Sequence, residues 1–131
     1  IGINYVMLSD TIGVADQPTI EYFFKNITVK FPDIDFGAHF HTTLPTWKRK
    51  IEPAYFNGCR RFDGAIKGFG GCPMAKDELT GNMPTENMVQ YFNENGIETG
   101  IDLNAFSYVL ELANEIFPRN MFVDHYRPKK N

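Results

Sequence analysis

The sequence has little of what marks several common protein classes. Its two cysteines, Cys59 and Cys72, are too few for a disulfide framework in 131 residues, and a reducing compartment is the simpler expectation. No apolar run approaches the about 20 residues that a membrane-spanning helix needs, so no contact with a membrane is expected. No signal peptide is visible from Ile1 onward.

The sequence also has no large excess of positive or negative charge. Lys and Arg number 13 against 16 Asp and Glu, the net charge is −3, and no basic block alternates with aromatic residues. Nucleic acid is therefore not an expected partner. Apolar material is abundant instead, because 43% of the residues are hydrophobic and 15% are aromatic. That content is typical of one globular domain with a core.

Strand-like and helix-like segments alternate along the chain. Residues 3–10, 33–41 and 59–66 have the character of strands, the first that of a buried parallel strand. Helices are predicted between residues 16 and 32, over 46–57, from 85 to Gly96 and from 102 to Pro118. Strand, loop and helix repeated three times predict an α/β fold with a parallel sheet and right-handed crossovers.

The predicted helices have recognisable starts. Asp16, Thr85 and Asp102 are the expected N-caps of the first, third and fourth helices. Pro53 lies inside the second helix, where its missing backbone N–H predicts a kink or a late start.

Two histidines, His39 and His41, stand in the stretch FGAHFHTT. Side chains alternate across a strand, so both face one side, roughly 7 Å apart along the backbone, and can converge on one ion. Phe40 between them faces the other way and packs in the core. Two hydrogen-bonded histidines at a strand end explain the spacing equally well.

A glycine-rich loop, KGFGGCPMAKDELTGN, follows the third strand and carries Cys72. A mobile lid that bears a thiol suits proton transfer in a closed site. A plain loop with a small buried cysteine is the alternative, and spacing alone favours it slightly. A phosphate-binding loop is disfavoured because the Lys-Ser/Thr ending of a P-loop is absent.

Three further polar residues are candidates for a site. Asn82 either caps the next helix or offers an amide oxygen to a metal. Glu86 either serves the site or complements the helix dipole in the first turn. Asp10 is a carboxylate at a strand end, and its alternative role is to hold the turn DTIG. Cys59 is expected in the core, and His125 is expected to be exposed in the polar tail.

Four segments, LSDTIGVA, AHFHTT, GFGGCPMA and TGNMPTE, resemble in order and approximate spacing the C-terminal part of the hydroxymethylglutaryl-CoA lyase family. That family belongs to the metal-dependent TIM-barrel lyases and Claisen-type synthases. The resemblance covers nearly the whole chain, to about Phe117. GGCP is its most specific part, because isopropylmalate and homocitrate synthases typically have a Gly-Glu-Arg-type sequence there.

The resemblance implies a divalent metal site and a reaction. His39 and His41 match the family's two histidine ligands, and Asn82 matches its asparagine ligand, for Mg²⁺ or Mn²⁺. The implied reaction is the retro-Claisen cleavage of 3-hydroxy-3-methylglutaryl-CoA to acetyl-CoA and acetoacetate, as in leucine degradation and ketone-body formation. The implied ion lowers the pKa of the C3 hydroxyl and orients it.

The resemblance also implies the proton-transfer groups. Cys72 matches the lid cysteine, Asp10 a strand-end aspartate in the catalytic centre, and Glu86 a glutamate just behind the asparagine ligand. Cys72 is the candidate donor to the enolate, and His39 or Asp10 relays the first proton.

This chain departs from the family pattern in several places. Thr42 stands where Asp is frequent, LPTWKRK replaces a glycine-containing helix start, and the loop from Cys72 to Asn82 is one residue longer. The adjacent Arg and Asp of the family's first strand have no match. Residues 1–131 are therefore expected to be the last three βα units, about strands six to eight, of a TIM (β/α)8 barrel plus a C-terminal helix. The N-terminal strands of that single catalytic domain are expected to be missing, and the piece alone is expected to be inactive.

Alternatives remain open at this point. They are another metal-dependent TIM-barrel aldolase or acyl-CoA synthase, a non-catalytic metal-binding module, and a structural α/β piece without a site. The implied partners are an acyl-CoA substrate and the rest of the barrel, and the resemblance also allows a homodimer. A bacterial cytoplasm and a mitochondrial matrix both suit the chain.

Overall fold

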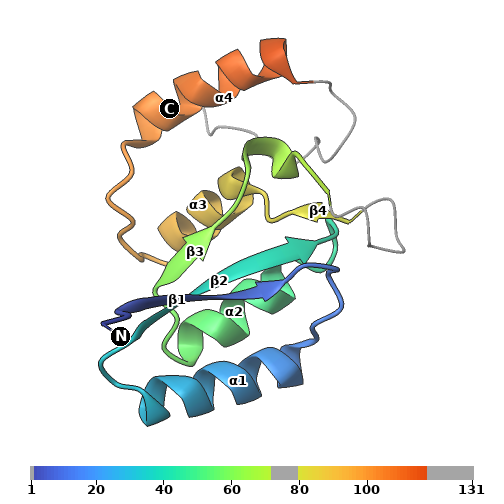
Figure 1. Ribbon diagram of the computed structural model, residues 1–131. Coiled ribbons are helices and arrows are strands. Elements are labelled where there is room, and N and C mark those ends of the chain that lie inside the picture. Colours follow the sequence, from blue (N-terminus) through green and yellow to red (C-terminus); the bar gives the residue numbers. More distant parts are fainter. Residues whose placement is uncertain (1, 72–79, 118–131) are drawn as a thin grey trace.

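The computed structural model describes residues 2–71 and 80–117, in which strands and helices alternate (Figure 1). In chain order the elements are β1 (Tyr5–Asp10), α1 (Gln17–Lys30), β2 (Asp35–Thr42), α2 (Lys48–Phe56), β3 (Arg61–Asp63), the 3-10 helix η1 (Ile66–Gly68), β4 (Gly81–Asn82), α3 (Thr85–Glu94) and α4 (Leu103–Ile116). Within these ranges, no helix is long and apolar enough to cross a membrane.

The sheet is built around β2. β1 pairs with β2 in parallel as far as Asp10 opposite Phe40, and β3 pairs with β2 in parallel with Asp63 opposite His39. The short β4 runs antiparallel to the end of β2 and sets Asn82 opposite His41. The predicted α/β fold with a parallel sheet is confirmed, and its carboxyl edge is completed by a strand that comes from far along the chain.

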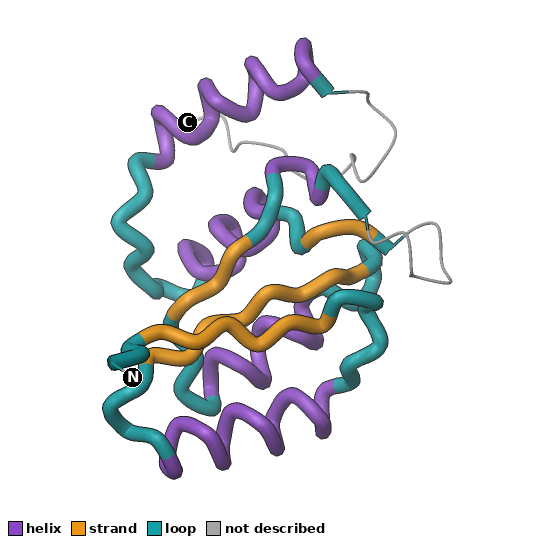
Figure 2. Tube along the Cα trace, viewed as in Figure 1, coloured by secondary structure: helices purple, strands orange, loops and turns teal. Residues whose placement is uncertain are grey.

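The main core lies on the side of this sheet that α1 and α2 cover (Figure 2), and α4 adds no residue to it. Phe36, Ala38 and Phe40 alternate along β2 and meet Phe24 of α1 and Ile51 of α2 in one buried cluster. Such alternation is the period of a strand, so the residues between them face the opposite side. His39 and His41 therefore share the face that α1 and α2 do not cover.

β1 is parallel as predicted, but its predicted burial is wrong for the described chain. It is the edge of the sheet, and its residues alternate between exposed and half-buried until the buried Asp10. Tyr5 is 65% exposed and Met7 38% exposed, while Val6 and Leu8 pack against the core. An edge strand with helices on one face buries only every second side chain, which an apolar sequence run cannot reveal.

Two of the three predicted N-caps are confirmed. The Asp16 side chain accepts from the backbone N–H of Thr19 at 3.0 Å, and the Asp102 side chain accepts from that of Asn104 at 2.9 Å. Thr85 is not a cap but the first residue of α3, after Pro84 at the cap position. Its backbone N–H donates to the carbonyl of Ala65, because Pro84 and Ala65 form a parallel bridge that sets the entry angle of the helix.

The second helix begins at Lys48, two residues after the predicted start, and retains Pro53 in its interior, so the proline does not mark the start of the helix. β3 covers Arg61–Asp63 and not the predicted residues 59–66, because the chain turns into η1, where Lys67 has a φ of 60°.

Candidate functional site

The histidine pair lies at the carboxyl end of β2. The rings of His39 and His41 are 5.2 Å apart between centroids, with 63° between their planes. Phe40 between them is 5% exposed and belongs to the core. The prediction that both imidazoles share one face, with Phe40 on the other, is confirmed.

Asp63 orients one of the two rings. The His39 Nδ1 lies 2.7 Å from Asp63 Oδ1, because the register of β2 and β3 sets these residues directly opposite each other. A carboxylate can only accept here, so the Nδ1 of His39 donates, and in the neutral imidazole the Nε2 lone pair is then left for a ligand. Asp63 was not among the site residues predicted from the sequence, although a carboxylate in the third predicted strand was a usable indication.

His41 is the more buried of the pair. It is 7% exposed, and its Nδ1 is buried without a hydrogen-bond partner in the described chain. Burial lowers the pKa of His41, and the neighbouring His39 lowers it further. The imidazole is thus held in the neutral form, which is the form that binds metals. A buried polar atom without a partner is costly, and a bound ion would offset that cost.

Asn82 faces His41 across the β2–β4 pair, and its amide is held firmly. The Nδ2 donates to the carbonyls of Phe69 at 2.8 Å and Gly70 at 3.2 Å. The Asn82 backbone N–H also donates to the Gly70 carbonyl, at 2.9 Å. With its NH₂ group occupied, the amide presents its oxygen as the end that can bind a cation.

Gly70 is required at this point of the loop. Its φ is +88°, a conformation that L side chains rarely adopt, and a Cβ there would lie 3.0 Å from Asn82 Nδ2. The glycine-rich loop therefore approaches the Asn82 amide with its backbone.

The three donors fit a divalent ion with mixed nitrogen and oxygen ligands. Two neutral imidazoles and an amide oxygen suit Mn²⁺ or a partly hydrated Mg²⁺. The described residues hold no cluster of three or more His, Cys, Asp or Glu side chains that would form a metal site by themselves. A site at this edge therefore depends on Asn82 and on ligands beyond the histidine pair.

Asp10 lies beside this edge in a dense set of contacts. Its Oδ1 accepts from the backbone N–H of Val14 and its Oδ2 from that of Ala15, each at 3.0 Å. Lys50 of α2 adds an ion pair to Oδ2 at 2.5 Å. These contacts agree with the alternative role of Asp10, which is to hold the turn after β1. Lys50 was not predicted from the sequence as a site residue. The sequence shows only a lysine directly before the apolar Ile51, and its burial is known from the structure alone.

Glu86 is buried at 7% exposure in the first turn of α3. Its Oε2 accepts from the backbone N–H of Lys67 at 2.9 Å, which ties α3 to η1. Burial raises the pKa of this carboxyl, and hydrogen bonds and the charge of Lys67 oppose the shift. Glu86 thus holds η1, the turn shortly before Gly70. None of its hydrogen bonds within the described residues reaches the histidine pair.

Of the two cysteines, only Cys59 lies within the described residues. Cys72, the predicted proton donor, lies outside the described residues, as does His125. Cys59 is fully buried, its thiol donates to the carbonyl of Arg61 at 3.2 Å, and burial raises its pKa to about 12. The prediction that Cys59 is a core residue is confirmed.

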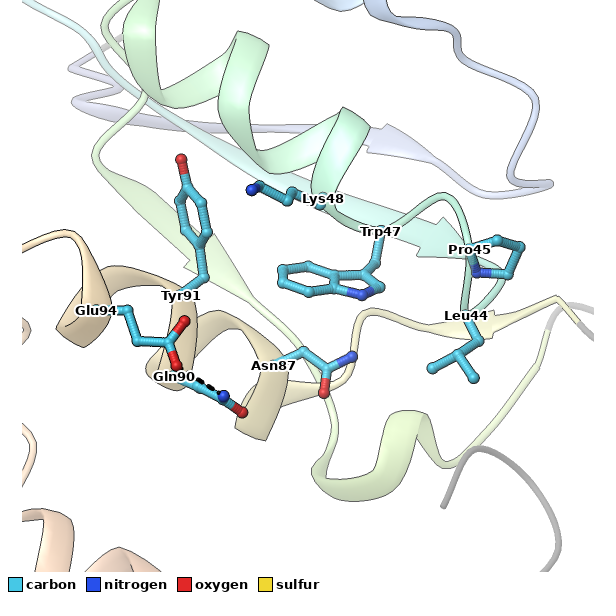
Figure 3. A pocket seen from close by; sticks show the side chains of 8 residues that line it. All are labelled: Leu44, Pro45, Trp47, Lys48, Asn87, Gln90, Tyr91 and Glu94. Atoms are coloured by element: carbon cyan, nitrogen blue, oxygen red, sulfur yellow. Dashed lines mark hydrogen bonds between the residues drawn. The ribbon is translucent and has the colours of Figure 1, made fainter. Parts of the chain in front are cut away.

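A pocket of about 490 Å³ opens between the start of α2 and α3 (Figure 3). Trp47 and Tyr91 form its aromatic wall, with ring centroids 6.2 Å apart, and the amide of Asn87 points toward the Trp47 indole. The complete lining is Leu44, Pro45, Trp47, Lys48, Asn87, Gln90, Tyr91 and Glu94. Because neither histidine lines it, this pocket is not the candidate metal site.

A parallel α/β sheet whose middle strand ends in paired histidines, opposite an asparagine, is an arrangement suited to a metal-dependent enzyme site. Residues 1–113 match the family model described as HMGL-like, and the chain belongs to this family. The resemblance inferred from GGCP and the histidine pair is thereby confirmed.

Curated relatives include two acyl-CoA lyases from bacteria. The (R)-citramalyl-CoA lyase of Chloroflexus aurantiacus is 37% identical over 105 residues, which are 80% of this chain and 33% of that protein. A hydroxymethylglutaryl-CoA lyase of Bacillus subtilis is 34% identical over 127 residues, 93% of this chain and 42% of that protein. The chain thus spans between 33% and 42% of the length of these relatives.

Solved structures agree with this assignment. The HMG-CoA lyase of Bacillus subtilis matches with a TM-score of 0.77 at 31% identity, over 88% of this chain and 38% of that one. The HMG-CoA lyase of Acinetobacter baumannii, in complex with coenzyme A and 3-methylmalate, matches with a TM-score of 0.75 at 33% identity, over 88% and 37%.

Proposed function

We propose that this chain is the C-terminal portion of a divalent-metal-dependent acyl-CoA lyase that cleaves 3-hydroxy-3-methylglutaryl-CoA to acetyl-CoA and acetoacetate. The observation that carries the proposal is the histidine pair. Asp63 orients His39, and the neutral His41 lies opposite Asn82 with its Nδ1 unpartnered in the described chain. The proposed location is the cytoplasm, with the mitochondrial matrix as the alternative.

The proposed architecture is the last three βα units of a TIM barrel, about strands six to eight, with α4 as the terminal helix. Two observations support it. Within the described residues β1 has a free edge, with exposed Tyr5 and Met7 on the histidine face, and the chain matches only 33% and 42% of the length of the two curated relatives named above. The remaining strands would cover that face and supply further ligands, so the described part alone is not expected to turn over substrate.

In this proposal His39, His41 and Asn82 hold the ion, and Asp63 keeps His39 in the binding tautomer. When bound, the ion supplies Lewis-acid polarisation of the substrate's C3 hydroxyl. A base then accepts the hydroxyl proton, and Asp10 is the candidate, because His39 donates from Nδ1 to Asp63 and uses Nε2 for the ion in this proposal. The carbon–carbon bond breaks, its electron pair passes to the thioester as an enolate, and Cys72 donates a proton to the enolate carbon. Glu86 supports the loop beside Asn82 through Lys67.

The test is acetoacetate release from 3-hydroxy-3-methylglutaryl-CoA by the full-length gene product. We expect release with Mg²⁺ or Mn²⁺ and its loss with a chelator. Absence of both metal binding and release would overturn the proposal. Metal binding without release would direct the search to other substrates.

A second candidate is the cleavage of a related branched acyl-CoA, as in the citramalyl-CoA lyase relative. Two features of this chain support this second candidate. Thr42 replaces an expected acidic residue directly after the histidine pair, and the segment LPTWKRK follows it. Rates measured with both acyl-CoA substrates would separate the candidates, and a metal-binding protein that cleaves neither would be a non-catalytic module.

A further inference from the structure

A buried cation joins two elements beside the histidine pair. Lys50, in the first turn of α2, is 3% exposed, and its partner Asp10, at the end of β1, is 9% exposed. The Lys50 Nζ donates to Asp10 Oδ2 at 2.5 Å and to the backbone carbonyl of His41 at 2.8 Å. One ammonium thus connects the end of β1, the end of β2 and the start of α2.

The carbonyl of His41 needs such a donor. β1 pairs with β2 only as far as Phe40, so the oxygen of the next residue lies past the end of that ladder. On the other side of the strand, the backbone N–H of Met83, directly after β4, donates to the carbonyl of Phe40 at 3.0 Å. Lys50 therefore supplies, from a side chain, the hydrogen bond that a longer β1 would have supplied from its backbone.

The turn after β1 closes over the same oxygen. Asp10 holds this turn through the backbone N–H groups of Val14 and Ala15. Gly13, in the turn, has a φ of +73°, and a Cβ there would lie 3.4 Å from the His41 carbonyl oxygen. The backbone of His41 is thus enclosed by the turn on one side and by the Lys50 ammonium on another.

Net stability is a weak explanation for this arrangement. Removing two charges from water costs about as much as their attraction returns, and an apolar pair of similar size is often as stable. What the pair does supply is a fixed position for the His41 backbone. Lys50 also belongs to LPTWKRK, the segment in which this chain departs from the family pattern.

We propose that Lys50 is a positioning residue of the metal site, which acts by holding the backbone of the ligand His41 through its carbonyl oxygen. Asp10 is its anchor, since the carboxylate fixes the ammonium and the turn together. This inference rests on the proposed function, because it requires His41 to be a metal ligand.

The first test is a Mn²⁺ titration of the full-length protein carrying Lys50→Met, which keeps the side chain as far as Cε and removes the ammonium with its donors. Loss of a residue that orients a ligand typically weakens metal binding by about 10- to 100-fold, and that is the expected effect. Lys48→Met is the matched control, since its ammonium lies in the same helix turn but is exposed and pairs with Glu52. The control is expected to keep the wild-type affinity, and a folded Lys50→Met variant with wild-type affinity would overturn the inference.

A second variant separates positioning from charge compensation. Lys50→Met leaves the carboxylate of Asp10 buried without its cation, which alone can unfold the protein. In the double variant Asp10→Asn/Lys50→Met both buried charges are gone, so thermal stability is expected to recover while Mn²⁺ affinity stays low. Recovery of both would show that the ammonium only compensates the carboxylate, and would overturn the inference. A wild-type protein that binds no Mn²⁺ would instead refute the metal site of the proposed function.

Discussion

The carboxylate of Asp63 accepts a 2.7 Å hydrogen bond from Nδ1 of His39 across two parallel strands. The interaction orients an imidazole that is 31% exposed at its side chain, so packing alone does not hold the ring. Carboxylates that hold metal-binding histidines in this way fix both the tautomer and the ring orientation.

Asp63→Asn is predicted to weaken Mn²⁺ binding by the full-length protein by about 10- to 100-fold, because an amide no longer fixes the Nδ1–H tautomer. Asp35→Asn is the matched control, since Asp35 lies at the other end of β2 and pairs with Arg61 at 3.6 Å. Isothermal titration of both variants checks the prediction. Equal affinities in the two variants would show that the Asp63 contact does not act on the site.

Gly70→Ala is predicted to destabilise the protein by about 1 kcal/mol or more and also to weaken metal binding. The first effect comes from the positive φ, and the second from a methyl group placed 3.0 Å from the Asn82 amide. Gly96→Ala shares the first effect alone, with a φ of +68° and no atom within 4 Å of the added Cβ. Thermal melts and Mn²⁺ titrations should therefore separate the variants, and a loss of affinity in both would contradict this account of Asn82.

Glu86→Gln is predicted to raise the free energy of unfolding at pH 7. Burial raises the pKa of Glu86, so the folded state holds its proton more tightly than the unfolded state does. The carboxyl contributes stability below its unfolded pKa, near the ordinary value of 4.5, and that contribution is lost as pH rises through the folded value. Glutamine keeps an acceptor for the Lys67 N–H and carries no charge.

Urea denaturation of Glu86→Gln at pH 7 and at pH 4 checks this sign. The gain over wild type should be present at pH 7 and smaller at pH 4. Glu111→Gln, at an exposed position of α4, is the matched control for the loss of one carboxylate. A Glu86→Gln variant that is less stable at pH 7 would mean that the charged carboxylate is favoured in the folded state.

Alkylation at neutral pH is predicted to spare Cys59, since burial raises the pKa of its thiol to about 12 and leaves almost no thiolate. The proposed lid cysteine, Cys72, is predicted to be alkylated, and the full-length protein is predicted to stop releasing acetoacetate once Cys72 is labelled. Peptide mass analysis after iodoacetamide treatment of wild type and Cys72→Ser checks both statements. Label on Cys59 in the folded protein would contradict its place in the core.

Local features of this protein follow from the sequence because their physics is local. The Asp16 and Asp102 caps need only a side chain within reach of its own helix, and His39 and His41 share a face because strands alternate. For the described chain, the burial of β1 and the cap at Thr85 were predicted wrongly. Both depend on residues far along the chain, because β1 lies at the edge of the described sheet and Ala65 forms a bridge with Pro84.

The sequence by itself determined the order of strands and helices, the family and the candidate ligands, since each is carried by a short run of residues. Only the tertiary structure decided which groups hold those ligands. His39 and Asp63 are 24 residues apart, and Asp10 and Lys50 are 40 apart. Such pairs meet through strand register and helix packing, which no local pattern encodes, and they make two histidines in a strand a candidate site with one ring oriented and the other kept neutral.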